Sequence, residues 1–223
     1  MDASPVNIEQ FPAEHLINVP IDTPYTSVKV MIERKRNALR HTTISIDSIS
    51  QIFTSLLVEK LIPHWLSTPW SFDGHTPVPG EGHIACVYFV STTLQDMGFN
   101  LNRYLFAQQL PMHEAKTISP GDPLTEINSP SKEERIRQLN IQLKEGIYFI
   151  GFNLNHVGYI QKKKSQLLLI YSNFINAEGV VIKPVETSQV FSYYHRLYIA
   201  GISTNRKLME MWLNGERISI INQ

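Results

Sequence analysis

The sequence predicts an α+β domain in which a layer of helices packs on one face of a small antiparallel sheet. Apolar residues recur at helical spacing in the first half, and short β-branched and aromatic runs dominate the second half. A chain of 223 residues, 43% of them hydrophobic, can bury one core without disulfides or a structural metal. We therefore expect one globular unit, with an irregular lead over 1–22, N-terminal helices over 23–66 packed on the core, and a main domain over 67–223.

The first half of the chain and its last segment predict helices, because apolar side chains there recur every three or four residues. Ser131 precedes two glutamates and is an expected N-cap. Gly98 and Gly215 are expected helix stops. The expected helices are 25–41, 47–61 with Pro63 ending it, 84–98, 103–109, 131–143 and 206–213. The Pro- and Gly-rich segment 67–82 is expected to be a loop, and 111–132 is expected to be turn-rich.

Short β-branched and aromatic runs fill the second half and predict strands. Asn, Gly, Lys and Ser separate the runs, as in an antiparallel meander. The expected strands are 146–152, 156–160, 166–174, 179–185 and 196–202. The charged run Lys162-Lys163-Lys164 is expected at a solvated hairpin tip. Because most helices come first and the strands second, the pattern indicates one helix layer on one face of the sheet.

The charge balance argues against a partner bound by bulk electrostatic attraction. The sequence has 20 Lys and Arg against 20 Asp and Glu, so we expect neither nucleic acid nor an anionic membrane as partner. No segment approaches the ~20 apolar residues of a membrane span, and the N-terminus lacks the pattern of a signal peptide. The expected location is cytoplasmic by default, or outside the cell by an export route without a classical signal. The sequence predicts no oligomeric state.

Cys86 is the only cysteine, which excludes an internal disulfide and a zinc site built from several cysteines. It lies near the start of an expected helix, where the helix dipole and backbone N–H groups lower the pKa of a thiol. A thiolate there is a nucleophile, and a nucleophilic cysteine needs a base. His156 is the best placed histidine, because it begins an expected strand that would hold its ring, and Gly158 leaves room beside it. His83, close to Cys86 in sequence, is a rival base.

A third polar group should orient the imidazole of His156, and the hairpin that follows narrows the choice. A two-residue turn at Lys163-Lys164 would pair His156 with Tyr171, whereas a turn at Lys164-Ser165 would pair it with Asn173. In both cases Tyr171 and Asn173 share a face with His156. Asn173 is chemically the better acceptor for the Nδ1–H group, and Tyr171 is its positional rival.

The other histidines near Cys86 do not form a recognisable metal-binding motif. The possible ligands on this stretch are His64, His75 and His83, with Asp73 and Glu81 nearby. They lie along a proline-rich loop without the fixed spacing of a ligand set. We therefore expect no metal and no other cofactor.

Three segments together form a pattern around Cys86 and His156. They are Thr68-Pro69-Trp70-Ser71-Phe72-Asp73-Gly74, Gly82-His83-Ile84-Ala85-Cys86-Val87-Tyr88-Phe89-Val90 and His156-Val157-Gly158-Tyr159-Ile160. This pattern resembles the NlpC-type cysteine peptidases, which cut bacterial cell-wall peptides and have a Thr-Pro-Tyr-x-Trp-Gly-Gly loop, an Asp-Cys-Ser-Gly-Phe-Val helix start and a His-Val-Gly strand. The resemblance covers roughly 67–175. Ala85, Val87-Tyr88 and Trp70 depart from the family pattern.

The resemblance implies a papain-like domain over 67–223, with a catalytic cysteine on a helix packed against a small sheet. It implies that Cys86 is the nucleophile and His156 the base, with Asn173 or Tyr171 as the third catalytic group. The implied substrate is a peptidoglycan-type peptide or muropeptide, cut at an amide bond by an endopeptidase or amidase. The residues expected to contact the substrate are Trp70, Phe72, Asp73, His83 and Tyr88.

The altered residues beside Cys86 leave two alternatives open. The first is an intracellular or effector-like deamidase or transacylase that uses the same pair of residues on another acyl group. The second is a catalytically inactive binding domain of the same fold.

Overall fold

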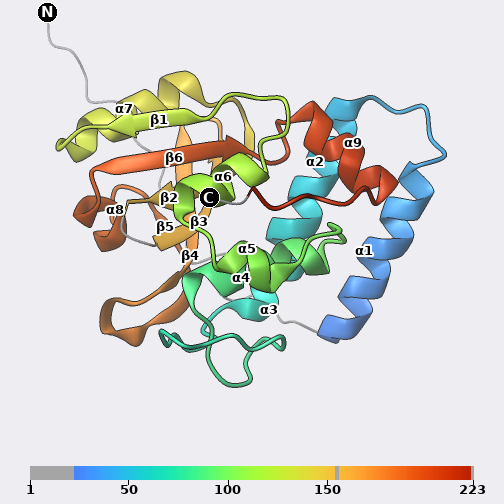
Figure 1. Ribbon diagram of the computed structural model, residues 1–223, viewed down its shortest axis with the longest axis horizontal. Helices are drawn as coiled ribbons and strands as arrows, with labels where there is room; N and C mark the ends of the chain where they lie inside the picture. Colours follow the sequence, from blue (N-terminus) through green and yellow to red (C-terminus); the bar gives the residue numbers. More distant parts are fainter. Residues whose placement is uncertain (1–22, 154–155, 222–223) are drawn as a thin grey trace, which may run out of the picture.

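The computed structural model describes residues 23–153 and 156–221, so the irregular lead expected over 1–22 lies outside the described residues. An antiparallel sheet forms the centre of the molecule, with helices on both of its faces (Figure 1). The α+β class is confirmed. None of the helices in the described ranges has the length and apolar character that a bilayer crossing needs.

The N-terminal helices are α1 (Tyr25–Leu39), α2 (Ile46–Ser55), the π-helical segment η2 (Leu56–Leu61) and α3 (Ile62–Trp65). The prediction that Pro63 ends the second helix is wrong, because the helical path continues to Trp65. Proline has no amide hydrogen, and its ring crowds the carbonyl of the residue four positions earlier, here Glu59. The wider turn of η2 directly before Pro63 accommodates that ring without ending the helix.

Between residues 84 and 132 the structure agrees only partly with the predicted elements. Helices α4 (Cys86–Asp96) and α5 (Arg103–Ala107) were expected, and Gly98 has the left-handed φ of +93° that follows the first of them. The turn-rich segment contains α6 (Pro111–Thr117) and β1 (Thr125–Asn128), neither of which was predicted. Both elements are short, so neither offers enough periodic positions for a pattern to appear in the sequence.

The sheet of the described residues has six strands, and all its neighbours are antiparallel. The order is β1-β6-β2-β3-β4-β5. The five strands expected from the sequence are β2 (Gly146–Phe152), β3 (His156–Lys163), β4 (Gln166–Asn173), β5 (Gly179–Pro184) and β6 (Arg196–Gly201). Strands β2 to β5 form the expected meander, but β6 returns to lie between β1 and β2.

Two hydrophobic clusters cover the two faces of the sheet. The first, called here the helix-face cluster, joins α1 to α6 and α9 (Arg206–Asn214) to one face through residues such as Phe89, Phe149 and Val157. The second, the opposite-face cluster, joins α7 (Lys132–Gln142) and α8 (Gln189–Tyr193) to the other face through residues such as Leu139 and Phe191. The expectation of helices on one face only is therefore wrong.

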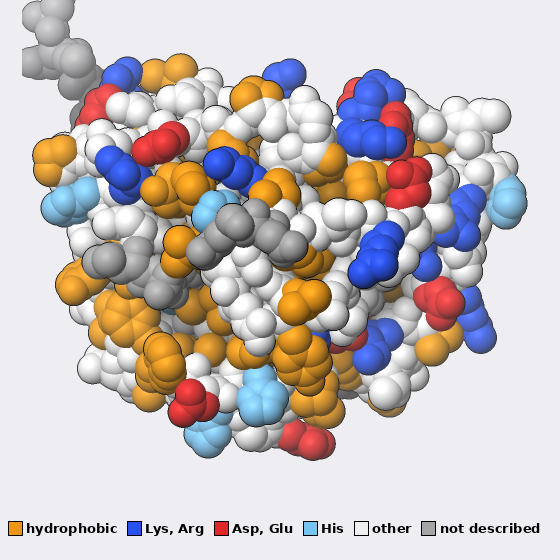
Figure 2. All heavy atoms as spheres, viewed as in Figure 1, with side chains coloured by type: hydrophobic (Ala, Val, Ile, Leu, Met, Phe, Trp, Pro, Cys, Tyr) orange, Lys and Arg blue, Asp and Glu red, His pale blue; other side chains and the backbone are white. Residues whose placement is uncertain are grey.

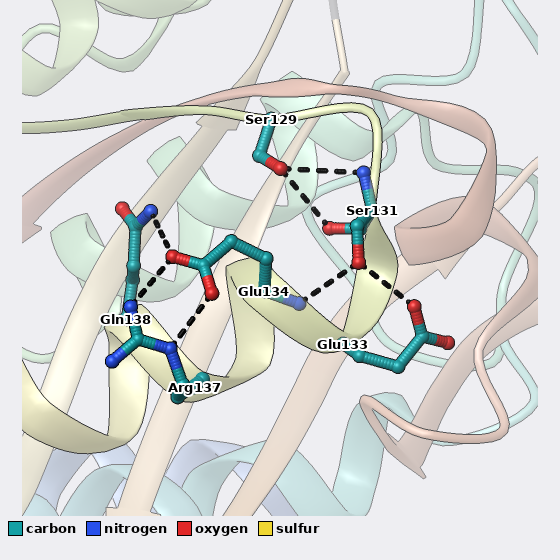
Figure 3. Close-up of polar contacts among 6 residues, drawn as sticks. All are labelled: Ser129, Ser131, Glu133, Glu134, Arg137 and Gln138. Carbon is teal, nitrogen blue, oxygen red and sulfur yellow. Dashed lines mark hydrogen bonds and ion pairs between the residues drawn. The ribbon is translucent and has the colours of Figure 1, made fainter.

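The N-terminus of α7 forms as its sequence predicts (Figure 3). The hydroxyl oxygen of Ser131 accepts a hydrogen bond from the backbone N–H of Glu134 at 3.1 Å, which caps the helix. The Glu134 carboxylate accepts further bonds from Arg137 and Gln138 on the next turn. The guanidinium of the buried Arg135 donates to the carbonyl of Phe191 at 2.9 Å, which ties α7 to α8.

The β3–β4 hairpin turns at Lys164-Ser165, since Lys163 pairs with Gln166. This is the second of the two turns that the sequence allows. The prediction of a solvated lysine run fails at its first member, because Lys162 is only 7% exposed and its ammonium group donates to the side chain and carbonyl of Asn140. Positive and negative side chains are interspersed on the face of the molecule shown in Figure 2, in keeping with the balanced composition.

Candidate active site around Cys86 and His156

Backbone contacts fix the start of α4, where Cys86 lies. The N–H of Ala85 donates to the carbonyl of Gly74 at 2.8 Å, and the N–H of Ile84 donates to the carbonyl of Pro69 at 2.9 Å. Gly74 permits this approach, because a Cβ there would lie 2.6 Å from the Ile84 nitrogen. The hydroxyl of Ser172 on β4 donates to the carbonyl of Ile84 at 2.7 Å. The loop, the helix start and the sheet therefore hold Cys86 at the first position of α4.

The environment of Cys86 is apolar, and the thiol is 6% exposed within the helix-face cluster. Burial raises the pKa of the thiol to about 12. Hydrogen bonds with the backbone of Val157, Val87 and Cys86 itself lower this pKa but do not offset burial, and the nearby Glu114 carboxyl raises it further. The prediction that the helix start produces a thiolate is therefore wrong for this state of the protein. Desolvation outweighs the helix dipole, and Cys86 is a neutral thiol at neutral pH.

His156 is the first residue of β3 and is 2% exposed. Its ring is enclosed by four aromatic side chains whose ring centroids lie 5.3 to 6.0 Å away: Phe152, Tyr171, Phe174 and Tyr194. The Nε2 atom has no hydrogen-bond partner among the described residues. Burial lowers the pKa of His156 to about 3, so its imidazole is neutral at pH 7.

Cys86 and His156 lie on either side of the beginning of β3. Cys86 belongs to the helix-face cluster together with Val157, whereas the ring of His156 contacts residues of the opposite-face cluster. The backbone of Val157 is hydrogen-bonded to the Cys86 sulfur, so the sulfur lies next to the peptide that joins Val157 to His156. Tyr194 is near both groups, since its ring is stacked on His156 at 6.0 Å and ionisation of Cys86 raises the pKa of its hydroxyl.

The two candidate orienting residues have different surroundings. Tyr171 meets the His156 ring edge-on at 5.7 Å, and its hydroxyl lies 3.3 Å from that of Ser188. The side chain of Asn173 is occupied in the turn after β4, where its amide donates to Glu178 at 2.7 Å and its oxygen accepts from the backbone of Ile175. Neither side chain is bonded to the Nε2 atom of His156.

Gly158 does leave room beside His156, and Tyr171 fills that room. A Cβ on Gly158 would lie 2.9 Å from the Cβ of Tyr171. The absence of a side chain at this position therefore lets Tyr171 approach the strand and enclose the imidazole from one side.

Of the residues expected to contact a substrate, Trp70 contacts Phe174, which in turn contacts His156. The rings of Trp70 and Phe174 lie 6.2 Å apart. Phe72 is 81% exposed, and Asp73 and His83 are exposed on the loop before α4.

Tyr88 is half-buried and contacts His75, Tyr104 and the guanidinium of Arg103. Side chains two positions apart on a helix point about 200° apart. Tyr88 therefore faces away from Cys86, on the other side of α4.

Within residues 23–153 and 156–221, the structure brings together no group of three His, Cys, Asp or Glu side chains that could hold a metal ion. This includes the histidines of the loop before α4.

Two polar residues of this region were missed by sequence reasoning. Tyr194 follows α8, a helix too short to be recognised from its pattern. Glu114 lies on the unpredicted helix α6, is fully buried, and influences the ionisation of Cys86. No sequence signal distinguishes Glu114 from an exposed glutamate, because its burial depends on the packing of α6 against β2 and β6.

Comparisons with protein-family models, with curated proteins and with solved structures give no match to this chain.

Proposed function

We propose that this protein is a cysteine hydrolase with a papain-like, NlpC-type fold, which cleaves an amide bond in a peptidoglycan-type peptide. The observation that supports this most strongly is the position of the Cys86 sulfur. It lies at the start of a helix packed on the sheet and is hydrogen-bonded to the backbone of Val157, the neighbour of His156. A thiol and an imidazole nitrogen that has no hydrogen-bond partner among the described residues, both next to the first peptide of β3, are the components of nucleophilic acyl transfer.

In the proposed reaction His156 takes the proton from the Cys86 thiol through a ring nitrogen, and the sulfur attacks the carbonyl carbon of the scissile amide. The backbone N–H of Cys86 at the helix start donates to the oxyanion that forms. The imidazolium then returns its proton to the leaving amine, and the C–N bond breaks. Water hydrolyses the resulting thioester, giving a carboxylic acid and the original thiol.

The neutral state of both groups sets the conditions for this reaction. Burial disfavours separated charges, so a thiolate and an imidazolium form together only when the substrate or a rearrangement of the site supplies compensating interactions. The two side chains lie on opposite faces of the sheet, with the first peptide of β3 between them. The proposed proton transfer therefore also requires the imidazole of His156 to move past this peptide toward the Cys86 sulfur.

Digestion of purified muropeptides followed by mass spectrometry tests the proposal. The wild-type protein should release new peptide products, and Cys86→Ala and His156→Ala should abolish the release. His195→Ala is the matched control, because His195 is an exposed histidine close in sequence to α8. It should retain the wild-type product profile, and each variant is first checked for an unchanged melting temperature.

Unchanged muropeptides in the presence of the wild-type protein contradict a cell-wall substrate. Cys86-dependent release of ammonia or transfer of an acyl group to another amine would then identify a deamidase or transacylase.

A catalytically inactive binding domain is the second candidate, and the burial of two neutral groups favours it. It predicts that wild type and Cys86→Ala give the same result in every one of these assays.

A further inference from the structure

Glu114 is a buried acid whose carboxyl group has no bonding partner in the described part of the chain. The residue is 0% exposed, and neither of its carboxyl oxygens has a hydrogen-bond partner there. A buried polar group without a partner destabilises the folded state. Such groups are rare, and they concentrate at functional sites.

The packing of α6 brings Glu114 to the same face of the sheet as Cys86. Pro111, at the start of α6, lies directly over Gly151, where an added Cβ would be 2.8 Å from the Pro111 Cβ. Glu114 is one turn further along the same side of the helix. Gly151 pairs with Val157, whose backbone is hydrogen-bonded to the Cys86 sulfur.

We propose that Glu114 is a positioning residue that acts through the thiol of Cys86. While Glu114 is protonated the thiol can ionise, and a negative charge on Glu114 suppresses the thiolate. The role assigned to this thiol rests on the proposed function. Two anions cannot form side by side in an apolar site without mutual repulsion. The two acids are therefore expected to titrate as a coupled pair.

The elements packed against α6 contribute few other ionisable groups. The ionisable residue of β2 is Tyr148, whose side chain belongs to the opposite-face cluster. The ionisable residues of β6 are Tyr198 and Arg196, and Arg196 is paired with Glu126 at 3.3 Å. On α6 itself, the Nδ1 atom of His113 is buried and has no hydrogen-bond partner within residues 23–153 and 156–221, and Lys116 is exposed. Tyr194 is also near Cys86, but its ring belongs to the opposite-face cluster. Glu114 is accordingly the carboxylic acid to change on the face of the sheet where Cys86 lies.

The test is the rate at which iodoacetamide alkylates Cys86 in the folded full-length protein, measured from about pH 6 to about pH 10. In the wild type, ionisation of Glu114 should flatten the rise of the rate with pH. Glu114→Gln keeps the shape of the side chain but cannot ionise. Its rate should equal that of the wild type at the acid end and exceed it by about tenfold at the alkaline end, the effect of one unit in the thiol pKa.

Glu114→Met removes the charge as well as the polar atoms, and it should give the same acceleration. Glu186→Gln, at an exposed position, is the matched control and should leave the profile unchanged. Amide hydrogen exchange at the start of α4 is compared between variants, and the proposal requires the acceleration without increased exchange. Superimposable profiles for wild type and Glu114→Gln overturn the proposal, as does an acceleration seen with only one of the two Glu114 variants.

The outcomes are separable from those of the muropeptide assay. If Glu114→Gln changes the labelling profile while Cys86→Ala leaves amide cleavage intact, the proposed function is wrong and the coupling stands. If the labelling profiles coincide while Cys86→Ala abolishes cleavage, the coupling is wrong and the proposed function stands.

Discussion

The buried imidazole of His156 makes the stability of the fold sensitive to acid. In the folded protein its pKa is lowered to about 3 by burial, whereas the ordinary value of 6.5 applies to the unfolded chain. Below the ordinary value the unfolded chain binds a proton that the folded protein does not bind. The contribution of His156 to stability is therefore fully present above 6.5 and is lost as the pH falls toward 3.

The size of this effect follows from the two pKa values. About pH 4.5 lies roughly two pH units below the ordinary value and above the folded one, and each unit corresponds to ~1.36 kcal/mol. We expect His156 to remove about 2.7 kcal/mol from the free energy of unfolding between about pH 7.5 and about pH 4.5. This is a large fraction of the stability of a domain of this size.

The assay is urea denaturation of wild type and His156→Phe at the two pH values. Phenylalanine suits the enclosure formed by Phe152, Tyr171, Phe174 and Tyr194, and it carries no titratable group. The other titrating groups are common to both proteins, so they cancel in the difference between the two pH-dependent losses. His156→Leu is the second variant, should the larger ring disturb the strand. Equal losses of stability in wild type and variant would refute the reasoning.

Two further predictions follow from backbone and thiol geometry. Gly74→Ala should lower the free energy of unfolding by about 2 kcal/mol or more, because the new Cβ would lie 2.6 Å from the Ile84 nitrogen. Gly80→Ala should cost about 1 kcal/mol, because its φ is +75° but no described residue other than its chain neighbours has an atom within 4 Å of the new Cβ. Equal costs in urea denaturation would contradict this. Iodoacetamide at neutral pH should label Cys86 about a thousandfold more slowly in the folded protein than in urea, since its pKa rises from 9.0 to about 12. Comparable rates would show that the thiol is not desolvated.

The parts of the fold that were predictable are those with a repeating pattern. The five strands from β2 to β6 and the helices α1, α4, α7 and α9 each contain enough alternating or three-to-four spaced residues to be recognised. Their caps were equally visible, as Ser131 and Gly215 show. The short elements α6, α8 and β1 were missed, because one or two turns of helix, or four residues of strand, contain no measurable period. Helix α5 is as short as α8 but was predicted.

The candidate site was predictable in composition but not in arrangement. The sequence placed Cys86 at a helix start and His156 at a strand start, and both positions are confirmed. The face of the sheet to which His156 points depends on its pairing with Phe152 on β2, a register that the sequence did not fix. Glu114 was beyond reach for a similar reason, since its burial follows from the packing of a helix that was itself missed.

The protonation state of Cys86 shows why a motif at a helix start predicts position better than chemistry. The helix dipole contributes ~0.3–1 kcal/mol to a nearby charge. The rise of the thiol pKa from 9.0 to about 12 corresponds to about 4 kcal/mol against the thiolate, several times the dipole. A helix start therefore lowers a thiol pKa only where solvent or a counter-charge has already reduced the cost of ionisation. At this site the free energy needed to ionise Cys86 must come from a group that displaces its apolar surroundings or neutralises its thiolate. A negative charge on Glu114 does the opposite, because it disfavours the thiolate.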